Sequence, residues 1–336
     1  MSKPKKILND PANVVSESIE GLVAASDGRL TRLGERNAVY RSDLPAGKGK
    51  VALVIGGGSG HEPMFPGFVG ENLADASACG EVFAAPAPDL ILDTVKAVYR
   101  GAGALFIYGN YSGDNMNFDI AAELAEAEGI LTRTVRVWDD VAAAPLERIT
   151  DRRGIAGDFF VIKVAGAAAA ELTDLDEVYR VAAKARDNTR SIGVALAAGS
   201  IPETGERTFE LGDDEIEIGM GAHGEPGIAR QKMTPADALA DQMIDFVLKD
   251  LPFVSGDEVA VLYNNLGSTT QMEMLIVARR VQKVLAGAGI RIHRTDMGNF
   301  LTCQEMAGMS VTLLRLDDEL KTYLDRPARS FAYSRS

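Results

Sequence analysis

Short apolar segments rich in Val, Ile and Leu alternate with helical patterns along the whole chain. This alternation is typical of wound α/β proteins, in which helices connect the strands and cover the sheet. The predicted strands span residues 50–56, 104–109, 131–138, 159–164, 191–197, 214–220, 257–264, 290–295 and 310–316. We therefore expect an α/β fold.

Two predicted helices carry recognisable end signals. Residues 88–101 begin with a proline and an aspartate, carry basic residues late and close on a glycine, which is the order expected from helix capping and the helix dipole. Residues 234–250 repeat that order, and Thr234 is the predicted N-cap. Both segments are therefore expected to be helical crossovers.

The chain of 336 residues is longer than the ~100–200 residues of an ordinary domain, so one large or two medium α/β domains are expected, and we favour two wound α/β domains. Residues 183–191 combine a charged helix end with the start of a new strand. A domain change at this point predicts an N-terminal domain of residues 1–185 and a C-terminal domain of residues 186–336.

The net charge of the chain argues against two classes of binding partner. With 35 basic and 48 acidic residues the net charge is -13, which opposes binding to nucleic acid or to an anionic membrane surface. No run approaches the ~18 apolar residues of a membrane span, and no apolar signal segment follows the basic N-terminus. A cytoplasmic protein is expected. Cys79 and Cys303 are far apart and are predicted to be core thiols without a disulfide.

The most unusual stretch is VALVIGGGSGHEPMF, residues 51–65. It resembles a phosphate loop but lacks the lysine of a Walker motif. It also fails the dinucleotide pattern G-x-G-x-x-G, because His61 or Pro63 takes the third glycine's place when counting starts at Gly56 or Gly58. Two interpretations remain: a loop whose backbone N–H groups bind a small oxygen-rich molecule beside His61, or a tight turn with a surface histidine.

A second glycine-rich loop contains another of the three histidines. His223 lies in IEIGMGAHGEPG, again at the end of a predicted strand, and its HGEP resembles the GHEP of the first loop. His293 alternates with isoleucines in a predicted strand and is expected to be structural or exposed. The two glycine-rich loops are therefore the stronger candidates for a functional site.

A third candidate is the stretch NYSGDNMNF, which contains Asp114 and precedes a helix expected to start near Asn117. Strand-to-helix loops of a parallel sheet lie at one edge, so Asp114 and His61 could converge on one crevice. The alternative is that Asp114 only forms a turn.

Metal and serine chemistry are weakly supported. Two imidazoles and a carboxylate allow a metal-dependent hydrolase, but no H-x-x-x-H or H-E-x-x-H spacing is present. Ser59 lacks the G-x-S-x-G frame of a serine hydrolase. We expect no metal site on this chain.

Several stretches together resemble the dihydroxyacetone kinase family, specifically its substrate-binding subunit. They are GGGSGHEPMFPGFVG, NYSGDNMNF, RRGIAGDFF with KVAGAAAA, GAHGEPGI, YNNLG and MSVTLLRLDDEL. The resemblance runs in order from about Ile7 to about Leu324. Each loop alone is a weak signal, but the combination is highly specific.

The resemblance implies roles for particular residues. His223 corresponds to the histidine whose ring nitrogen adds to the substrate ketone and holds it as a hemiaminal, a bond that glycerol cannot form because it has no carbonyl group. Asp114 corresponds to the general base for the hydroxyl that is phosphorylated. The loop that contacts the substrate corresponds to Gly58, Ser59, Gly60 and His61. Within it, His61 has an acid/base role.

One position departs from the family pattern. Many members carry a lysine directly before the motif that contains Asp114, whereas this chain has Gly109 there. Loss of that side chain leaves space and an unfilled contact in the substrate pocket. A four-carbon ketose such as erythrulose is therefore as credible as dihydroxyacetone, and the chain resembles erythrulose kinases in this respect.

The resemblance also implies partners. Single-chain members append a helical nucleotide domain, for which we expect no room after DRPARSFAYSRS. The expected protein is the ketose-binding subunit of a two-component kinase and a homodimer. ATP or ADP with Mg²⁺ is expected on a separate nucleotide-binding subunit, with no cofactor on this chain. The alternative is a non-catalytic ketose sensor that uses the same loop.

Overall fold

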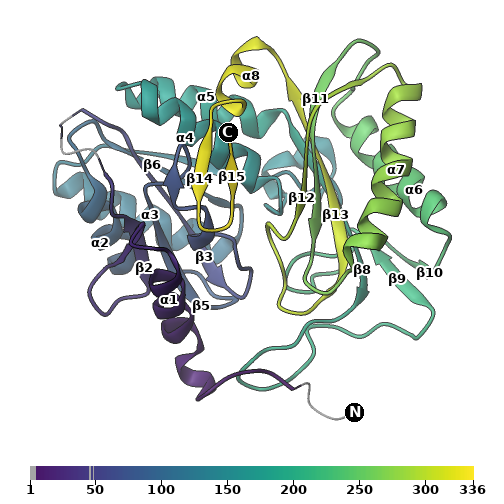
Figure 1. The fold of residues 1–336 in the computed structure, drawn as a ribbon, viewed down its shortest axis with the longest axis horizontal. Coiled ribbons are helices and arrows are strands. Elements are labelled where there is room, and N and C mark those ends of the chain that lie inside the picture. The colour runs from purple at the N-terminus through teal and green to yellow at the C-terminus, as the bar shows by residue number, and fades with distance from the viewer. Residues whose placement is uncertain (1–4, 45–46, 48) are drawn as a thin grey trace. The chain divides into compact units, whose positions relative to one another are not determined.

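The computed structural model describes residues 5–44, 47 and 49–336 (Figure 1). Contacts divide these residues into two compact units. The N-terminal unit comprises Lys5–Val137, Asp158–Arg186 and Leu320–Ser336, and the C-terminal unit comprises Trp138–Gly157 and Asp187–Glu319. Both units are α/β, as predicted.

The two units interleave along the chain instead of following one another. The chain passes between them at Arg186 and Asp187, next to the division expected from the sequence, and at three further points. The segment Trp138–Gly157 groups with the later strands because it pairs with them: the Ser191 N–H donates to the Asp139 carbonyl over 2.7 Å. Contacts between segments distant in sequence thus define the units.

A six-stranded sheet organises the N-terminal unit, in the order β1-β2-β5-β3-β6-β7. β3 pairs in parallel with β5 and β6, β6 pairs in parallel with β7, and β1 and β2 extend the sheet antiparallel. The strands span Leu30–Arg32 (β1), Ala38–Arg41 (β2), Ala52–Ser59 (β3), Ala76–Val82 (β5), Ala104–Gly109 (β6) and Thr132–Val137 (β7). A small second sheet contains Gly70–Glu71 (β4), Ala328–Ser330 (β14) and Ser334–Arg335 (β15).

Helices cover this sheet and bury alternate strand residues. A core cluster joins Val54, Phe106 and Tyr108 with Ile91 of α2 and Phe118 of α3, and all five are fully buried. On α4, a Cβ added to Gly166 would lie 2.5 Å from the Leu73 backbone. The helices of the unit span Val14–Ala25 (α1), Pro88–Val98 (α2), Ser112–Ala127 (α3), Asp158–Glu171 (α4), Leu175–Asp187 (α5) and Asp318–Leu324 (α8). Short 3-10 turns occupy Pro11–Asn13 and Pro66–Phe68.

The prediction of a strand at residues 159–164 was wrong, because these residues lie in helix α4. The helix is buried almost all round, and even Lys163 is inaccessible, with its Nζ donating to the Tyr323 carbonyl over 3.0 Å. A helix without a solvent face shows no apolar period of 3.6 residues, so its sequence resembles a buried strand.

The C-terminal unit has its own six-stranded sheet, in the order β10-β9-β8-β13-β11-β12. Only β11 and β12 pair in parallel, and the other neighbours are antiparallel. The strands span Thr189–Ala197 (β8), Glu215–Ile218 (β9), Ala229–Lys232 (β10), Glu258–Asn265 (β11), Arg291–Gly298 (β12) and Ala307–Leu316 (β13). A 3-10 segment occupies Leu146–Asp151.

Helices α6 (Ala236–Asp250) and α7 (Gln271–Gly287) contact each other and cover the C-terminal sheet (Figure 1). α7 begins with a capping box formed by Thr270 and Glu273. The predicted N-cap of α6 was wrong, because Pro235 takes that position and Thr234 makes no capping bond. Both cysteines are buried and free, as predicted.

Candidate functional site

The glycine run at residues 56–58 belongs to strand β3 and is not an open loop, contrary to the sequence-based expectation. Gly56 pairs with Ala78 and Gly58 pairs with Gly80 of β5. A Cβ on Gly57 would lie 2.3 Å from the Phe65 ring, and one on Gly58 would lie 2.8 Å from the Ala84 nitrogen. Glycine is required here because neighbouring groups approach the strand too closely for a side chain.

The loop proper starts at Gly60, where φ is +99°. His61 follows and is 4% exposed, and its ring lies 5.1 Å from the ring of Phe83. The Gly60 N–H donates to the Glu62 carboxylate at 3.0 and 3.1 Å. Desolvation of the carboxylate by the surrounding protein raises the pKa of Glu62, although hydrogen bonds from the backbone N–H groups of Gly60 and Glu62 oppose that shift. The alternative of a surface histidine is therefore wrong: His61 is held inside a structured turn.

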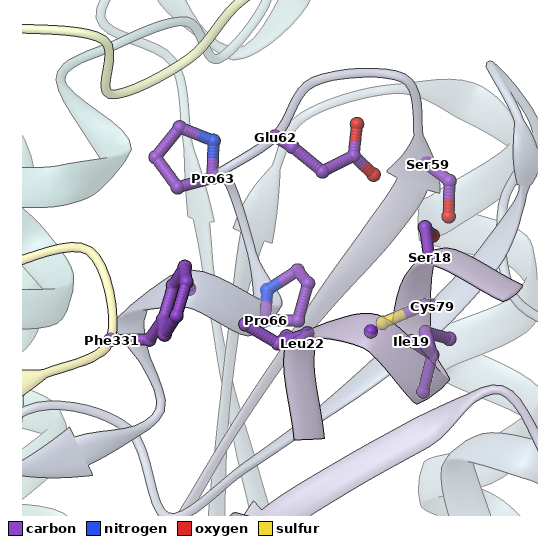
Figure 2. Close-up of a pocket in the computed structure, with 11 residues that line it drawn as sticks. Ser18, Ile19, Leu22, Ser59, Glu62, Pro63, Pro66, Cys79 and Phe331 are labelled. Atoms are coloured by element: carbon purple, nitrogen blue, oxygen red, sulfur yellow. The ribbon is translucent and has the colours of Figure 1, made fainter. Parts of the chain in front are cut away.

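Ser59 and Glu62 line a cavity of about 350 Å³ that also contains Cys79 and Phe331 (Figure 2). The Ser59 hydroxyl donates to the Gly80 carbonyl over 2.7 Å. Burial raises the pKa of the Cys79 thiol to about 12, which leaves it unreactive at neutral pH. The remaining wall is largely apolar and consists of Ser18, Ile19, Gly21, Leu22, Pro63, Pro66 and Gly67. This cavity suits a sugar poorly, and neither His61 nor Asp114 lines it.

Asp114 lies in the first turn of α3 and not in a loop before it, so the helix start predicted near Asn117 was wrong. From the first turn of the helix, the Asn115 amide donates to Oδ1 of Asn110, which directly follows β6, over 2.9 Å. The first turn of a helix favours an ionised carboxylate, because backbone N–H groups point toward it. Asp114 is partly buried.

The sheet brings Asp114 and His61 to the same edge. β3 and β6 are adjacent and parallel, so the chain leaves both strands on one side, toward His61 and toward Asp114 respectively. This is the arrangement that the sequence predicted for the two loops. Gly109, the last residue of β6, is buried and pairs with Val137 of β7.

The residue beside Gly109 illustrates how the strand is anchored. Tyr108 stacks on Phe118 of α3 with 4.2 Å between ring centroids, and its hydroxyl accepts from Arg136 Nε over 3.2 Å. Burial raises the pKa of Tyr108 to about 12 although Arg136 opposes the shift. Because strand side chains alternate, a side chain at residue 109 would point away from α3.

His223 lies in the C-terminal unit, in a loop that follows β9. Gly219 and Gly224 have positive φ values of 77° and 89°, which allow the chain to turn on both sides of the histidine. Glu225 contacts His223 twice: its Oε2 accepts from the His223 backbone N–H over 2.9 Å, and its Oε1 lies 3.0 Å from ring Nδ1. The ring is therefore held by a side chain of its own loop.

The charge of Glu225 defines the imidazole tautomer. Burial alone would raise the pKa of Glu225, but the hydrogen bonds and charge of His223 outweigh burial and lower the pKa to about 2. An ionised carboxylate can only accept hydrogen bonds, so Nδ1 of His223 must carry the hydrogen. In the neutral ring the lone pair then resides on Nε2.

The two glycine-rich loops share a local bonding pattern. In each, a glutamate followed by proline accepts from the backbone N–H two residues earlier, Glu62 from Gly60 and Glu225 from His223. The likeness of GHEP and HGEP is visible in the sequence, but Glu225 was not predicted as a partner of the histidine. Its position two residues after His223 was the available signal.

His293 lies in β12, as predicted, with Nδ1 3.4 Å from Glu258 Oε1 of the neighbouring strand. Within the described ranges no group of three His, Cys, Asp or Glu side chains could hold a metal ion. Likewise, none of the helices described is long and apolar enough to cross a membrane.

Comparison with known proteins places these loops in context. The Dak1 domain model matches residues 20–332. The PTS-dependent dihydroxyacetone kinase 2, dihydroxyacetone-binding subunit DhaK, of Listeria innocua is 45% identical over 324 residues, which cover 96% of this chain and 97% of that protein. The L-erythrulose 1-kinase of Mycolicibacterium smegmatis is 39% identical, and the match covers 98% of this chain and 58% of that longer protein.

Solved structures agree. The dihydroxyacetone kinase of C. freundii, in complex with AMP-PNP and Mg²⁺, superposes with a TM-score of 0.90 at 34% identity, covering 98% of this chain and 61% of that one. The dihydroxyacetone kinase operon co-activator DhaQ has a TM-score of 0.89 at 30% identity, covering 95% and 98%. The chain therefore belongs to the dihydroxyacetone kinase family, in the group defined by the Dak1 domain, as its motifs predicted.

Proposed function

We propose that this chain is the ketose-binding subunit of a two-component kinase, which takes its phosphoryl group from a separate polypeptide. The dihydroxyacetone-binding subunits of Listeria innocua and Escherichia coli match it over 97% and 98% of their own lengths. The two L-erythrulose kinases of Mycolicibacterium smegmatis and Pectobacterium atrosepticum are 39% and 38% identical to it, against 45% for the Listeria innocua subunit. The proposal keeps the homodimer and the cytoplasmic location expected from the sequence.

The observation that carries the proposal is the pair formed by His223 and Glu225. With hydrogen on Nδ1, the Nε2 lone pair adds to the ketone carbon, a C–N bond forms and the C=O π bond breaks. The former carbonyl oxygen takes up a proton, for which His61 is the acid in this proposal. The Glu225 carboxylate stabilises the positive charge that develops on the ring. The product is a hemiaminal, which a polyol cannot form.

The remaining roles are those that the family resemblance implies. Asp114 acts as the general base that accepts the proton of the hydroxyl to be phosphorylated. Gly58 and Ser59 at the end of β3, together with Gly60 of the turn that follows, contact the substrate. Because the Ser59 hydroxyl already donates to Gly80, we expect its backbone to make the contact.

The partner carries the nucleotide. We propose that ATP or ADP with Mg²⁺ is held by the separate nucleotide-binding subunit. This chain then contributes binding and orientation of the ketose together with the base. Division of labour of this kind suits phosphoryl transfer, which depends mainly on positioning and charge neutralisation.

Gly109 bears on the length of the sugar. The dihydroxyacetone-binding subunits are more similar to this chain than the erythrulose kinases are, yet Gly109 removes a side chain from the pocket. We expect Gly109→Lys to raise the preference for dihydroxyacetone over erythrulose about tenfold, because one pocket contact of ~1.4 kcal/mol has that effect. Relative kcat/KM values for the two sugars test this. Gly109→Ala is the control for loss of glycine alone, and an unchanged ratio in the lysine variant would remove the pocket argument.

A second function has specific support. The co-activator DhaQ shares the fold at 30% identity over almost its whole length, so a ketose sensor could be built on the same scaffold. Such a sensor would need His223 but has little use for a base aimed at a hydroxyl. The presence of Asp114 in the first turn of α3 favours the kinase subunit.

One assay separates the two functions. The chain is mixed with candidate nucleotide-binding subunits and supplied with either ATP or phosphoenolpyruvate and its relay proteins. Phosphorylation of dihydroxyacetone and of both erythrulose enantiomers is then measured. The kinase subunit predicts transfer with at least one partner, and binding of ketose without transfer in every combination would favour the sensor.

A further inference from the structure

A partly buried arginine, Arg153, lies beside the glutamate that holds His223. Arg153 Nε donates to Asp140 Oδ2 over 3.0 Å, and its Nη2 lies 2.8 Å from the same oxygen. Nη2 also donates to the Gly219 carbonyl over 3.0 Å, at the turn where the His223 loop begins. One edge of the guanidinium is therefore anchored both to a carboxylate and to the loop backbone.

Asp140, which holds this arginine, is itself fixed by hydrogen bonds. Its side chain is 1% exposed, and its Oδ1 accepts from the Ala142 N–H over 3.0 Å. The Asp140 N–H in turn donates to the Arg153 carbonyl over 3.2 Å. Main-chain and side-chain bonds between the two residues thus leave the guanidinium little freedom to move.

The remaining nitrogen of Arg153 points toward the functional loop. Nη1 lies 4.0 Å from Glu225 Oε2, the oxygen that accepts from the His223 backbone N–H. Arg153 is 12% exposed and Glu225 33% exposed, so solvent screens this attraction less than it would on an open surface.

The absence of a side chain at Gly221 allows Arg153 and Glu225 to approach each other. A Cβ at this residue would lie 2.2 Å from Glu225 Oε2 and 2.5 Å from Arg153 Nη1. Its φ is not in the left-handed region, so backbone conformation does not require glycine here. Glycine is required at this residue because any side chain would occupy the space of the Glu225 carboxylate and the Arg153 guanidinium.

We propose that Arg153 is a positioning residue for ketose capture: anchored by Asp140, it orients Glu225 so that His223 keeps its hydrogen on Nδ1 and its lone pair on Nε2. This inference rests on the proposed function, and it adds two residues that do not themselves touch the sugar. Loss of the guanidinium would free Glu225 to rotate away from the ring and let the hydrogen move to Nε2, which is then no longer nucleophilic.

The test measures capture and tautomer separately. The variants are Arg153→Met, the double variant Arg153→Met with Asp140→Asn, which avoids an unpaired buried carboxylate, and the conservative Arg153→Lys. Arg280→Met is the matched control, because Arg280 of α7 pairs with Asp241 of α6 at 2.6 Å in the same unit, and neither residue belongs to the His223 loop. Thermal unfolding of each variant shows whether it folds.

Capture is followed by ¹³C NMR with dihydroxyacetone labelled at the carbonyl carbon, which becomes tetrahedral in the hemiaminal. The tautomer is followed by ¹⁵N NMR of histidine-labelled protein, in which the three histidines are assigned with single alanine variants. We expect the methionine variants to weaken capture about tenfold or more, which is the scale on which hydrogen-bond partners of metal-binding histidines act. The His223 hydrogen should shift toward Nε2, and Arg153→Lys should restore part of both signals.

The outcomes distinguish this inference from the proposed function. If wild-type protein forms a hemiaminal and folded Arg153→Met forms it equally well with an unchanged tautomer, the positioning role is refuted and the proposed function stands. If wild-type protein shows no tetrahedral carbon, the hemiaminal itself is refuted. An effect of equal size in Arg280→Met would show that any lost ion pair of this unit has the same consequence, which also refutes the role.

Discussion

Replacement of His223 by alanine is expected to abolish covalent ketose retention, because the nitrogen that forms the C–N bond is removed. The loop itself should remain folded: the Glu225 contact to the residue 223 backbone N–H does not depend on the ring. The measurement is the ¹³C signal of bound dihydroxyacetone together with kcat/KM in the presence of the nucleotide-binding subunit. Both the tetrahedral signal and turnover should fall to background.

His293→Ala provides the control for this experiment. His293 belongs to the same unit and also lies beside a glutamate, with 3.4 Å between Nδ1 and Glu258 Oε1, but it is part of strand β12. Its loss should leave capture and turnover unchanged. A His223→Ala protein that still carries the sugar through a covalent bond would contradict the assignment of the nucleophile.

Replacement of Asp114 by asparagine is expected to separate binding from chemistry. The amide keeps the size of the side chain in the first turn of α3 but cannot accept a proton, so the hemiaminal should still form. Turnover should fall by about 10²- to 10⁴-fold, which is the usual contribution of a general base. Ketose retention by NMR and kcat with the partner subunit are measured on the same protein.

Asp119→Asn is the matched control, because Asp119 is another carboxylate of α3 and is paired with Arg136 at 2.6 Å. It should leave kcat unchanged. Normal turnover in Asp114→Asn would show that another group takes the proton. If instead the wild-type chain captures ketose but no partner transfers phosphate to it, there is no transfer step in which Asp114 could act as the base. The ketose sensor then becomes the better explanation.

Strands and helices could be predicted from the sequence where a local apolar run or a helix-end signal marks them. The strands at Ala52–Ser59 and Ala104–Gly109 and the helix at Pro88–Val98 follow from local apolar runs and end signals. Helix α4 could not be recognised, because the surrounding protein buries every face of it and removes the periodicity. The two units could not be derived either, because segments such as Trp138–Gly157 are assigned by partners distant in sequence.

The candidate site shows the same division. The family could be recognised from the sequence alone, and His61, Asp114 and His223 could be proposed as site residues, because their loops have a distinctive order of residue types. Only the tertiary structure decided that Gly57 and Gly58 are glycines for close packing of β3, since the groups that exclude a side chain come from elsewhere in the chain. It also decided that Arg153, 70 residues before His223 in the sequence, lies behind its glutamate. A contact between segments distant in sequence leaves no local sequence pattern, so only the folded structure reveals it.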